Sequence, residues 1–239
     1  MTLPVLVLRP EPGASATLAS ARAAGLNAYA FPLFAVRPLA WEPVAADTVD
    51  ALLIGSANAL RHGGAALAQY RGLPAYTVGE TSARAARDAG LHVIATGRGG
   101  LQDLLDRLEP GHARLLRLAG RERVELAVPP QVEIVVREVY ASEPVPLPDG
   151  LAHALAAPVL ALLHSGEAAV RLAQLCDEAG IARSHIHLAA IGPRVGRRAG
   201  TGWTRVRSAA SPDDAALLAL AAQMCQDIAH DAQLPEKRP

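Results

Sequence analysis

The chain has 239 residues, of which 51% are hydrophobic and 19% charged, a balance that excludes an intrinsically disordered protein and allows one large domain or two small ones. Its 23 basic and 23 acidic residues cancel, so neither a nucleic-acid-binding protein nor a protein held on an anionic membrane surface is expected. Every basic residue except Lys237 is an arginine, whose planar guanidinium group suits carboxylates and phosphates.

The N-terminal segment MTLPVLVLRP lacks the basic region and the cleavage site of a signal peptide and is predicted to be a first strand. The longest apolar stretch, LAHALAAPVLALLH, is too short to span a membrane and contains Pro158. Short apolar runs that alternate with amphipathic segments predict buried strands at 4–8, 50–55, 75–79, 92–96, 114–119, 158–164 and 187–192.

Most of these strands are followed by helix signals, the clearest of which lies near the C-terminus. Ser211 is predicted to cap a helix there, Pro212 fits its first turn, and Asp213 and Asp214 suit its positive end. A strand followed by a helix, repeated along a chain, predicts an α/β fold with parallel sheets.

The sequence also contains a weak internal repeat. LLIGSANAL at 52–60 aligns with LLHSGEAA at 162–169, which places Ser56 on Ser165. AYTVGETSARAARDAG aligns with LAAIGPRVGRRAG, which places Gly79 on Gly192. A looser similarity joins the N-terminal segment to the segment that begins at 115. The order of these repeats indicates a duplicated α/β unit and therefore two similar lobes.

Two extended segments, 29–41 and 132–146, are rich in β-branched and aromatic residues and are punctuated by prolines. Paired side by side, they would form a two-stranded bridge between the lobes. The first lobe would then consist of 1–36 and 143–239, and the second of 40–134. The residues alone leave two contiguous lobes as an alternative.

Ser165 lies between His164 and a helix signal, which raises the question of a nucleophilic serine. The G-x-S-x-G spacing of a hydrolase is absent, His164 would point to the opposite face of the strand, and Ser56 is preceded by Gly55 rather than by a base. Both serines are therefore predicted to cap helices whose backbone N–H groups bind anions.

The turns that contain Gly79 and Gly192 have the same design, and their glycines are predicted to permit a close approach of the backbone. No dinucleotide or phosphate-loop motif is present. His185 and His187 would share one strand face, but no further ligands complete a metal site, so no metal is expected there. Cys176 and Cys225 are expected to be buried free thiols in a reducing cytoplasm.

The same segments resemble the uroporphyrinogen-III synthase family along nearly the whole chain. No single segment is specific, but their order and spacing are. They are LRP at 8–10, FPLFAVRP, IGSANAL, VGETSARAARDAG, LRLAGRERVEL, REVYASEP, LLHSGEAAV, AIGPRVGRRAG and AASPDDAALLAL. The resemblance implies two flavodoxin-like lobes with parallel sheets, joined by a two-stranded β linker, with the second lobe inserted into the first.

The resemblance also implies a lyase of tetrapyrrole biosynthesis (haem, sirohaem or cobalamin). Such an enzyme cyclises hydroxymethylbilane with inversion of ring D and loss of water, without a metal or a cofactor. The substrate carries eight carboxylates, which suit helix N-termini and arginine side chains. The azafulvene formed by loss of the hydroxyl reacts readily, so positioning of the chain is the main task, and a weak acid assists departure of the hydroxyl.

Tyr140 matches the tyrosine that assists loss of the leaving group and is the predicted catalytic residue. Ser82 stands where the family usually has threonine, whereas the matching position in the other lobe, Val195, has no hydroxyl. The predicted substrate-binding residues are Ser56, Ser82, Gly79, Ser165, Gly192, Arg9, Gly120, Arg121 and Arg194.

Two other functions stay open at this point. One is a non-catalytic two-lobe protein that binds a small anion, although such proteins are usually exported. The other is an inactive homologue of the synthase, which Val195 suggests. No large exposed apolar stripe is evident, so a cytoplasmic monomer is expected, with the small-molecule substrate and neither nucleic acid nor membrane as its partner.

Overall fold

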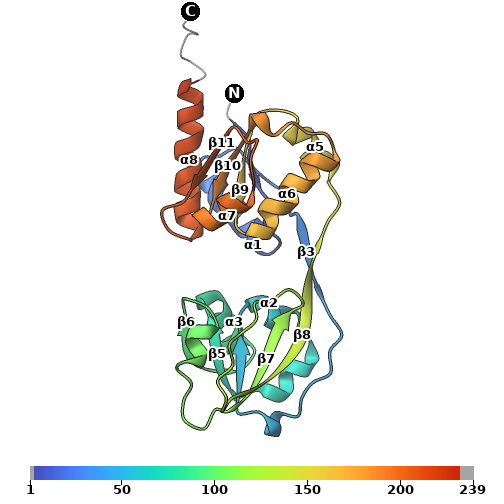
Figure 1. The fold of residues 1–239 in the computed structure, drawn as a ribbon, viewed down its shortest axis with the longest axis vertical. Coiled ribbons are helices and arrows are strands. Elements are labelled where there is room, and N and C mark those ends of the chain that lie inside the picture. Colours follow the sequence, from blue (N-terminus) through green and yellow to red (C-terminus); the bar gives the residue numbers. More distant parts are fainter. Residues whose placement is uncertain (1–2, 232–239) are drawn as a thin grey trace, which may run out of the picture. The chain divides into compact units, whose positions relative to one another are not determined.

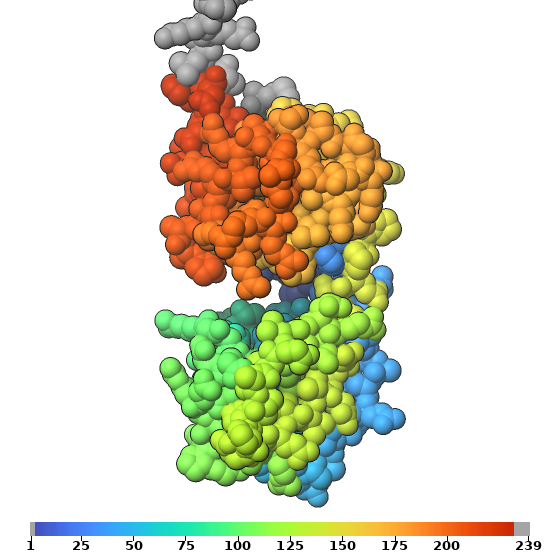
Figure 2. All heavy atoms as spheres, viewed as in Figure 1, coloured from blue at the N-terminus to red at the C-terminus, as the bar shows by residue number. Residues whose placement is uncertain are grey.

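The computed structural model describes residues 3–231, which divide into two compact units (Figure 1). Unit 1 comprises the described residues up to Ala35 and those from Pro144 onward, and unit 2 comprises Val36–Glu143. In Figure 2 the atoms of unit 2 run in colour from light blue to yellow. The chain crosses between the units twice, within strand β3 (Phe34–Pro38) and at the end of strand β8 (Glu133–Pro144).

Unit 1 is built on a five-stranded sheet in which the paired strands are parallel. Numbered along the chain, its strands lie in the order 2-1-3-4-5, which is the flavodoxin-like order. Its central strands are buried along their whole length, as expected of a sheet covered on both faces. The strands are β1 (Val5–Val7), β2 (Ala28–Ala30), β9 (Val159–Leu163), β10 (Ile186–Ala190) and β11 (Arg205–Ser208).

Helices cover both faces of this sheet. Successive residues of a strand contact opposite layers, so Leu6 packs in one core and Val7 in the other. The helical layer that packs against Val7 consists of α1 (Gly13–Ala23) and α8 (Asp214–Asp231). The helical layer that packs against Leu6, on the opposite face of the sheet, consists of α5 (Asp149–Leu155), α6 (Gly166–Glu178) and α7 (Pro193–Arg198).

Unit 2 has a six-stranded sheet in the order β3-β8-β7-β4-β5-β6. Its further strands are β4 (Ala51–Ile54), β5 (Pro74–Val78), β6 (His92–Gly97) and β7 (Arg114–Gly120). The five strands from β8 to β6 are parallel and repeat the arrangement of unit 1, with β7 and β8 in the places of β1 and β2. The internal repeat of the sequence therefore corresponds to two sheets of the same topology.

The two faces of the sheet in unit 2 are covered unequally. Helices α2 (Ala57–His62) and α3 (Glu80–Asp88), with the 3-10 helix Ala65–Tyr70, cover one face. The other face carries the four-residue helix α4 (Gln102–Leu105) and the segment 121–132, which contains no helix. In unit 1 the corresponding connection is the eleven-residue helix α1. This face of unit 2 is thus only thinly covered.

All seven predicted strands are present with ends shifted by at most two residues, and β2 and β11 were not predicted. The segment 29–41, predicted to belong to the bridge, is extended at its start, but there Ala28–Ala30 pairs with β1 inside the sheet of unit 1. The cap predicted at Ser211 is wrong. Helix α8 begins at Asp214, and Asp213 Oδ1 accepts a hydrogen bond of 2.8 Å from the Ala216 N–H, because Asp213 immediately precedes the first turn.

Two further expectations need correction. His185 lies in the 3-10 helix Arg183–His185 and bonds to the Leu155 carbonyl, so it does not share a strand face with buried His187. Cys176 is buried as expected, whereas Cys225 is only half-buried, and both thiols are free. Within residues 3–231 no helix is long and apolar enough to cross a membrane.

Candidate active site

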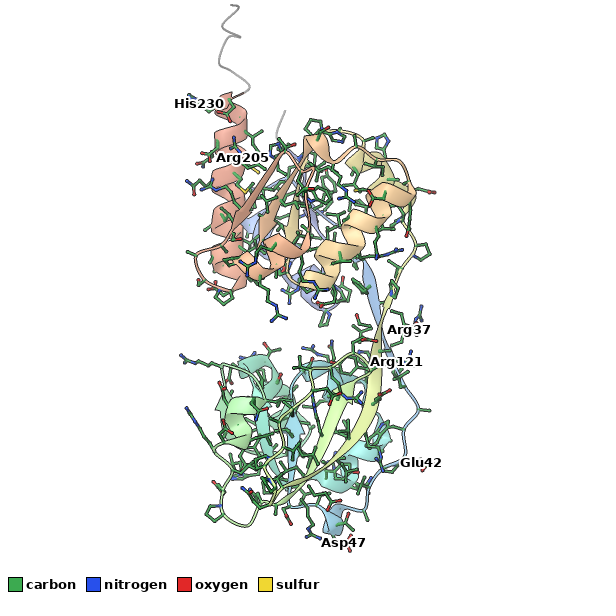
Figure 3. The ribbon with its side chains drawn as sticks, viewed as in Figure 1. Arg37, Glu42, Asp47, Arg121, Arg205 and His230 are labelled. Atoms are coloured by element: carbon green, nitrogen blue, oxygen red, sulfur yellow. The ribbon has the colours of Figure 1, made fainter. Side chains whose placement is uncertain are left out.

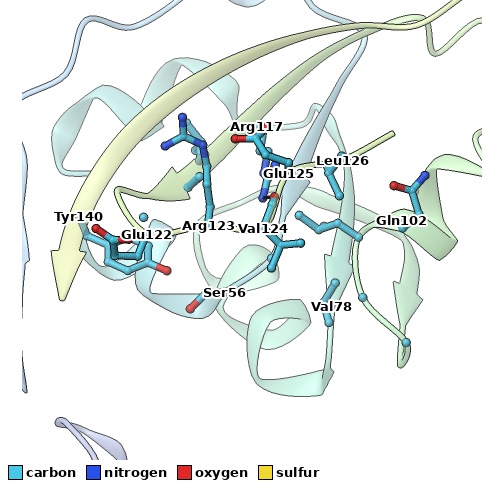
Figure 4. A pocket seen from close by; sticks show the side chains of 17 residues that line it. Ser56, Val78, Gln102, Arg117, Glu122, Arg123, Val124, Glu125, Leu126 and Tyr140 are labelled. Atoms are coloured by element: carbon cyan, nitrogen blue, oxygen red, sulfur yellow. Dashed lines mark hydrogen bonds between the residues drawn. The ribbon is translucent and has the colours of Figure 1, made fainter. Parts of the chain in front are cut away.

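A cavity of about 370 Å³ lies in unit 2 at the carboxyl ends of β4, β5 and β7 (Figure 4). This is the edge at which open parallel sheets bind ligands, and the volume is within the range of small-molecule sites. Ser56 follows β4, Val78 ends β5 and Gly120 ends β7. The outer wall comes from residues 99–102 and 122–126, on the thinly covered face of the sheet.

Tyr140 lines this cavity because the pairing of β8 with β7 is irregular. Ala119 lies opposite Glu138, but the next residue, Gly120, lies opposite Tyr140, so that Val139 is an extra residue on β8. A bulge of this kind redirects the side chain that follows it and is common beside active sites. The Arg121 N–H then donates a 2.9 Å hydrogen bond to the Tyr140 carbonyl.

The ring of Tyr140 rests on the backbone of Gly120. A Cβ atom at Gly120 would lie 2.7 Å from Tyr140 Cζ and 3.0 Å from its hydroxyl oxygen, closer than side chains tolerate. Gly120 therefore provides the space that the tyrosine occupies. His62 of α2, which the sequence analysis did not single out, has its ring centroid 6.3 Å from that of Tyr140.

Both serines of the internal repeat cap helices, as predicted. Ser56 Oγ accepts a 3.2 Å hydrogen bond from the Asn58 N–H, and Ser165 Oγ accepts one of 3.1 Å from the Ala168 N–H. In this role each hydroxyl still has its own proton to donate outward. His164 is not a base for Ser165, because its Nε2 lies 2.8 Å from Asp214 Oδ1.

The two glycine turns differ in backbone conformation although the repeat aligns them. Gly79 has a φ of 75°, a left-handed conformation that favours glycine, and precedes α3. Gly192 has a φ of −171°, and a Cβ there would meet no atom within 4 Å, so packing within the described chain does not require glycine. Ser82 lies on α3 with 4% exposure and does not line the cavity.

Arg9 belongs to a network of polar side chains in unit 1. Its Nη1 lies 3.3 Å from Thr17 Oγ1 and 3.4 Å from Asp214 Oδ1, while Thr17 Oγ1 donates a 2.8 Å bond to Asp214 Oδ2. His164 completes the network through Asp214. Burial lowers the pKa of His164, against the opposing effect of its hydrogen bond to Asp214, so the imidazole is neutral at physiological pH.

Of the predicted residues, the cavity brings together Ser56, Gly120 and Tyr140. Gly79, Ser82 and Arg121 belong to unit 2 without lining it, and Arg9, Ser165, Gly192 and Arg194 belong to unit 1. Arg121, labelled in Figure 3, and Arg194 are exposed. Within residues 3–231 no group of His, Cys, Asp and Glu side chains is arranged to hold a metal ion.

The cavity also contains Arg117 and Arg123, which the sequence analysis did not select. Arg123 forms a 2.6 Å ion pair with Glu138, whereas Arg117 is buried on β7. The signal for Arg117 was available in the strand RLLRLA, where an arginine stands in the middle of an otherwise apolar run. Such a residue is expected to have a partner or a function.

Comparisons with known proteins agree with this fold. A family model described as uroporphyrinogen-III synthase HemD matches residues 15–219. The uroporphyrinogen-III synthetase structure from Helicobacter pylori is 16% identical with a TM-score of 0.61, and the alignment covers 94% of this chain and 100% of that chain. A mutant uroporphyrinogen III synthase from the extremely thermophilic bacterium Thermus thermophilus is 17% identical with a TM-score of 0.55, over 95% and 99% of the two chains.

At these identities the two structures establish the shared fold, while the family model covers most of the sequence. A search of curated proteins gives no match. The chain belongs to the uroporphyrinogen-III synthase family, whose members are lyases of tetrapyrrole biosynthesis that cyclise hydroxymethylbilane.

Proposed function

We propose that the cavity around Tyr140 is where this protein converts hydroxymethylbilane to uroporphyrinogen III. The observation that supports this most directly is that the redirected Tyr140 and the capping Ser56 line one cavity at the ligand-binding edge of the sheet. Within the described residues, Tyr140 Oη forms no hydrogen bond, which leaves its proton available for the substrate.

In this proposal Tyr140 acts as a general acid. The pyrrole nitrogen expels the terminal hydroxyl of the substrate, and Tyr140 Oη donates a proton so that the oxygen leaves as water. Ring D then attacks the resulting azafulvene through its substituted carbon and forms a spirocyclic intermediate. The bond from that carbon to its original methylene bridge breaks, the freed methylene bonds to the unsubstituted α-carbon of ring D, and the proton lost from that carbon returns to Tyr140. The cavity walls hold the reacting rings in the orientation that gives isomer III.

The substrate contacts are also proposals. The Ser56 hydroxyl can donate its proton to a substrate carboxylate while it caps α2. Ser165, Gly192, Arg194 and Arg9 of unit 1, and Gly79, Ser82 and Arg121 of unit 2, remain predicted substrate-binding residues. The open space at Gly192, where a Cβ would meet no atom within 4 Å, is consistent with a ligand approaching that backbone.

The decisive experiment supplies freshly made hydroxymethylbilane to the purified full chain and measures the ratio of isomers III and I after oxidation. We expect isomer III in excess over a sample without protein. Tyr140→Phe should lower kcat about 100-fold, the usual effect of losing a general acid, whereas Ser165→Ala should leave most of kcat. Product no richer in isomer III than the control would refute the function, and equal losses in both variants would refute the role of Tyr140.

We also propose that the protein is a cytoplasmic monomer. One lobe would consist of residues 1–36 and 143–239 and the other of residues 40–134, with β3 and β8 as the linker between them. The unpaired thiols of Cys176 and Cys225 suit a reducing compartment. The large apolar side chains exposed on the described residues, such as Tyr29, Val124 and Val206, are few. Light scattering coupled to size exclusion would give a dimer mass if the monomer is wrong.

A further inference from the structure

Arg117 is a buried cation on the central strand β7 and lines the cavity around Tyr140 (Figure 4). Its exposure is 7%, and its neighbours along the strand, Leu116 and Leu118, are buried apolar residues. Arg117 Nη2 donates a 2.9 Å hydrogen bond to the Val124 carbonyl, while Nε is buried and has no hydrogen-bond partner among the described residues.

No carboxylate of the described chain forms an ion pair with Arg117. The arginines around it are satisfied differently, since Arg123 pairs with Glu138 at 2.6 Å and Arg114 of the same strand pairs with Asp50 at 2.9 Å. Burial and the nearby charge of Arg123 lower the pKa of Arg117, although Glu125 and Tyr140 oppose this. The guanidinium thus retains unused hydrogen-bonding capacity and has no carboxylate of the described chain in direct contact.

The internal repeat allows Arg117 of unit 2 to be compared with the residue at the equivalent position of unit 1. Val7 pairs with Leu162, three residues before Ser165, and Arg117 pairs with Leu53, three residues before Ser56. Arg117 therefore occupies in unit 2 the place that Val7 occupies in unit 1. Val7 is buried under α1 and α8, so an apolar side chain satisfies this position where helices cover it.

A buried cation without a counter-ion costs folding free energy, and replacement of such groups by apolar residues is often neutral or stabilising. The charge of Arg117 would be compensated if a ligand supplied a carboxylate in the cavity. Guanidinium groups bind carboxylates through strong, charge-assisted hydrogen bonds.

We propose that Arg117 binds a carboxylate of the substrate and thereby anchors one pyrrole ring beside Tyr140. This inference rests on the proposed function, and it adds a substrate-binding residue on β7. The ligand class is a polycarboxylated tetrapyrrole. Arg117 keeps its bond from Nη2 to Val124, and its free Nη donors are directed to the ligand.

The test compares Arg117→Met and Arg117→Gln with a matched control, Arg114→Met, in the full-length protein. Loss of a charge-assisted hydrogen bond should raise KM for hydroxymethylbilane about 10- to 100-fold in both Arg117 variants, with kcat within about threefold of wild type. The Tm of Arg117→Met should equal or exceed that of wild type. Arg114→Met should show the opposite pattern, an unchanged KM and a lower Tm, because it breaks the pair with Asp50.

A wild-type KM in both Arg117 variants would overturn the inference. So would a lower Tm with reduced kcat and an unchanged KM, since that pattern means that Arg117 only supports the segment around Val124. Failure of both variants to fold would overturn it as well, because the guanidinium would then be required by the fold.

Failure of the proposed function is recognised separately. A wild-type protein that yields no excess of isomer III refutes the synthase activity and leaves the carboxylate site to be tested by equilibrium binding of uroporphyrin III. There, an increase in Kd of about 10-fold or more on Arg117→Gln supports the anion site, and an unchanged Kd overturns it.

Discussion

Replacement of Asp214 by alanine should destabilise unit 1 by about 3 kcal/mol. The carboxylate accepts hydrogen bonds from Thr17 at 2.8 Å, His164 at 2.8 Å and Arg9 at 3.4 Å. Thr17 is fully buried and the His164 side chain is 7% exposed, so water cannot easily replace the lost acceptor. Two buried donors that lose a charged partner cost about 1.5 kcal/mol each, and the half-buried Arg9, whose bond is long at 3.4 Å, adds little.

The two tryptophans of the chain allow the units to be followed separately. Trp203 lies in unit 1 and Trp41 in unit 2, so a Trp41→Phe background leaves fluorescence that reports on unit 1 alone. Urea unfolding in this background should show a lower midpoint for Asp214→Ala at an unchanged slope. The control is Asp227→Ala on the same helix, where a 2.9 Å pair with partly exposed Arg207 contributes at most about 1 kcal/mol.

A loss from Asp214→Ala no larger than that from Asp227→Ala would refute the reasoning. A double-mutant cycle with Thr17→Val sharpens the test, because removal of both partners should cost less than the sum of the single losses. A coupling free energy of about 1 kcal/mol or more is expected for side chains in direct contact. Additive losses would mean that the contact between Thr17 and Asp214 contributes no coupling free energy.

Two further predictions concern single residues. Burial lowers the pKa of His164 below its unfolded value of about 6.5, so the unfolded state binds more protons than the folded state below that pH. The contribution of His164 to the free energy of unfolding is therefore fully present above pH 6.5 and is lost as the pH falls through the folded pKa. Urea midpoints of unit 1 at pH 7.5 and 5.5 should therefore differ less in His164→Gln than in wild type, and an identical difference would contradict the lowered pKa. Gly120→Ala should lower kcat about 100-fold, because a Cβ 2.7 Å from Tyr140 Cζ must displace the ring by roughly 1 Å. An unchanged kcat in Gly120→Ala would show that the position of this ring does not matter.

Most of the strands that the sequence predicts are buried on both faces, and the exception is His92–Gly97, an edge strand of unit 2. Val5–Val7, Val159–Leu163 and Ile186–Ala190 are continuous apolar runs because helices cover both sides of them. The unpredicted strands, Ala28–Ala30 and Arg205–Ser208, are the two edges of the sheet in unit 1. Both strands are short and only partly buried, so neither forms a long buried run, and their pairing with β1 and β10 identifies them.

Some features of the candidate site depend on residues that are neighbours in the sequence, and others depend on how distant strands pair. Helix capping by Ser56 and Ser165 depends on a few neighbouring residues, which a sequence pattern can reveal. The orientation of Tyr140 depends on one extra residue, Val139, in the pairing of two strands, and no local pattern marks it. The sequence resemblance selected Tyr140 and Gly120, but only their contact explains why the second must be glycine.

The difference between the two copies of the α/β unit accounts for the position of the cavity. Five strands of each sheet have the same order, and both units place a capping serine after the corresponding strand. In unit 1, α1 and the eighteen-residue α8 close one face, whereas in unit 2 the corresponding connections are a segment without a helix, 121–132, and the four-residue α4. The cavity lies under this reduced cover. The duplicated fold thus has two equivalent sheets, each with the carboxyl ends of its strands at one edge. The shorter covering segments of unit 2 leave a cavity at that edge. In this cavity Arg117 stands at the position of the apolar Val7, and Tyr140 is accessible to a ligand.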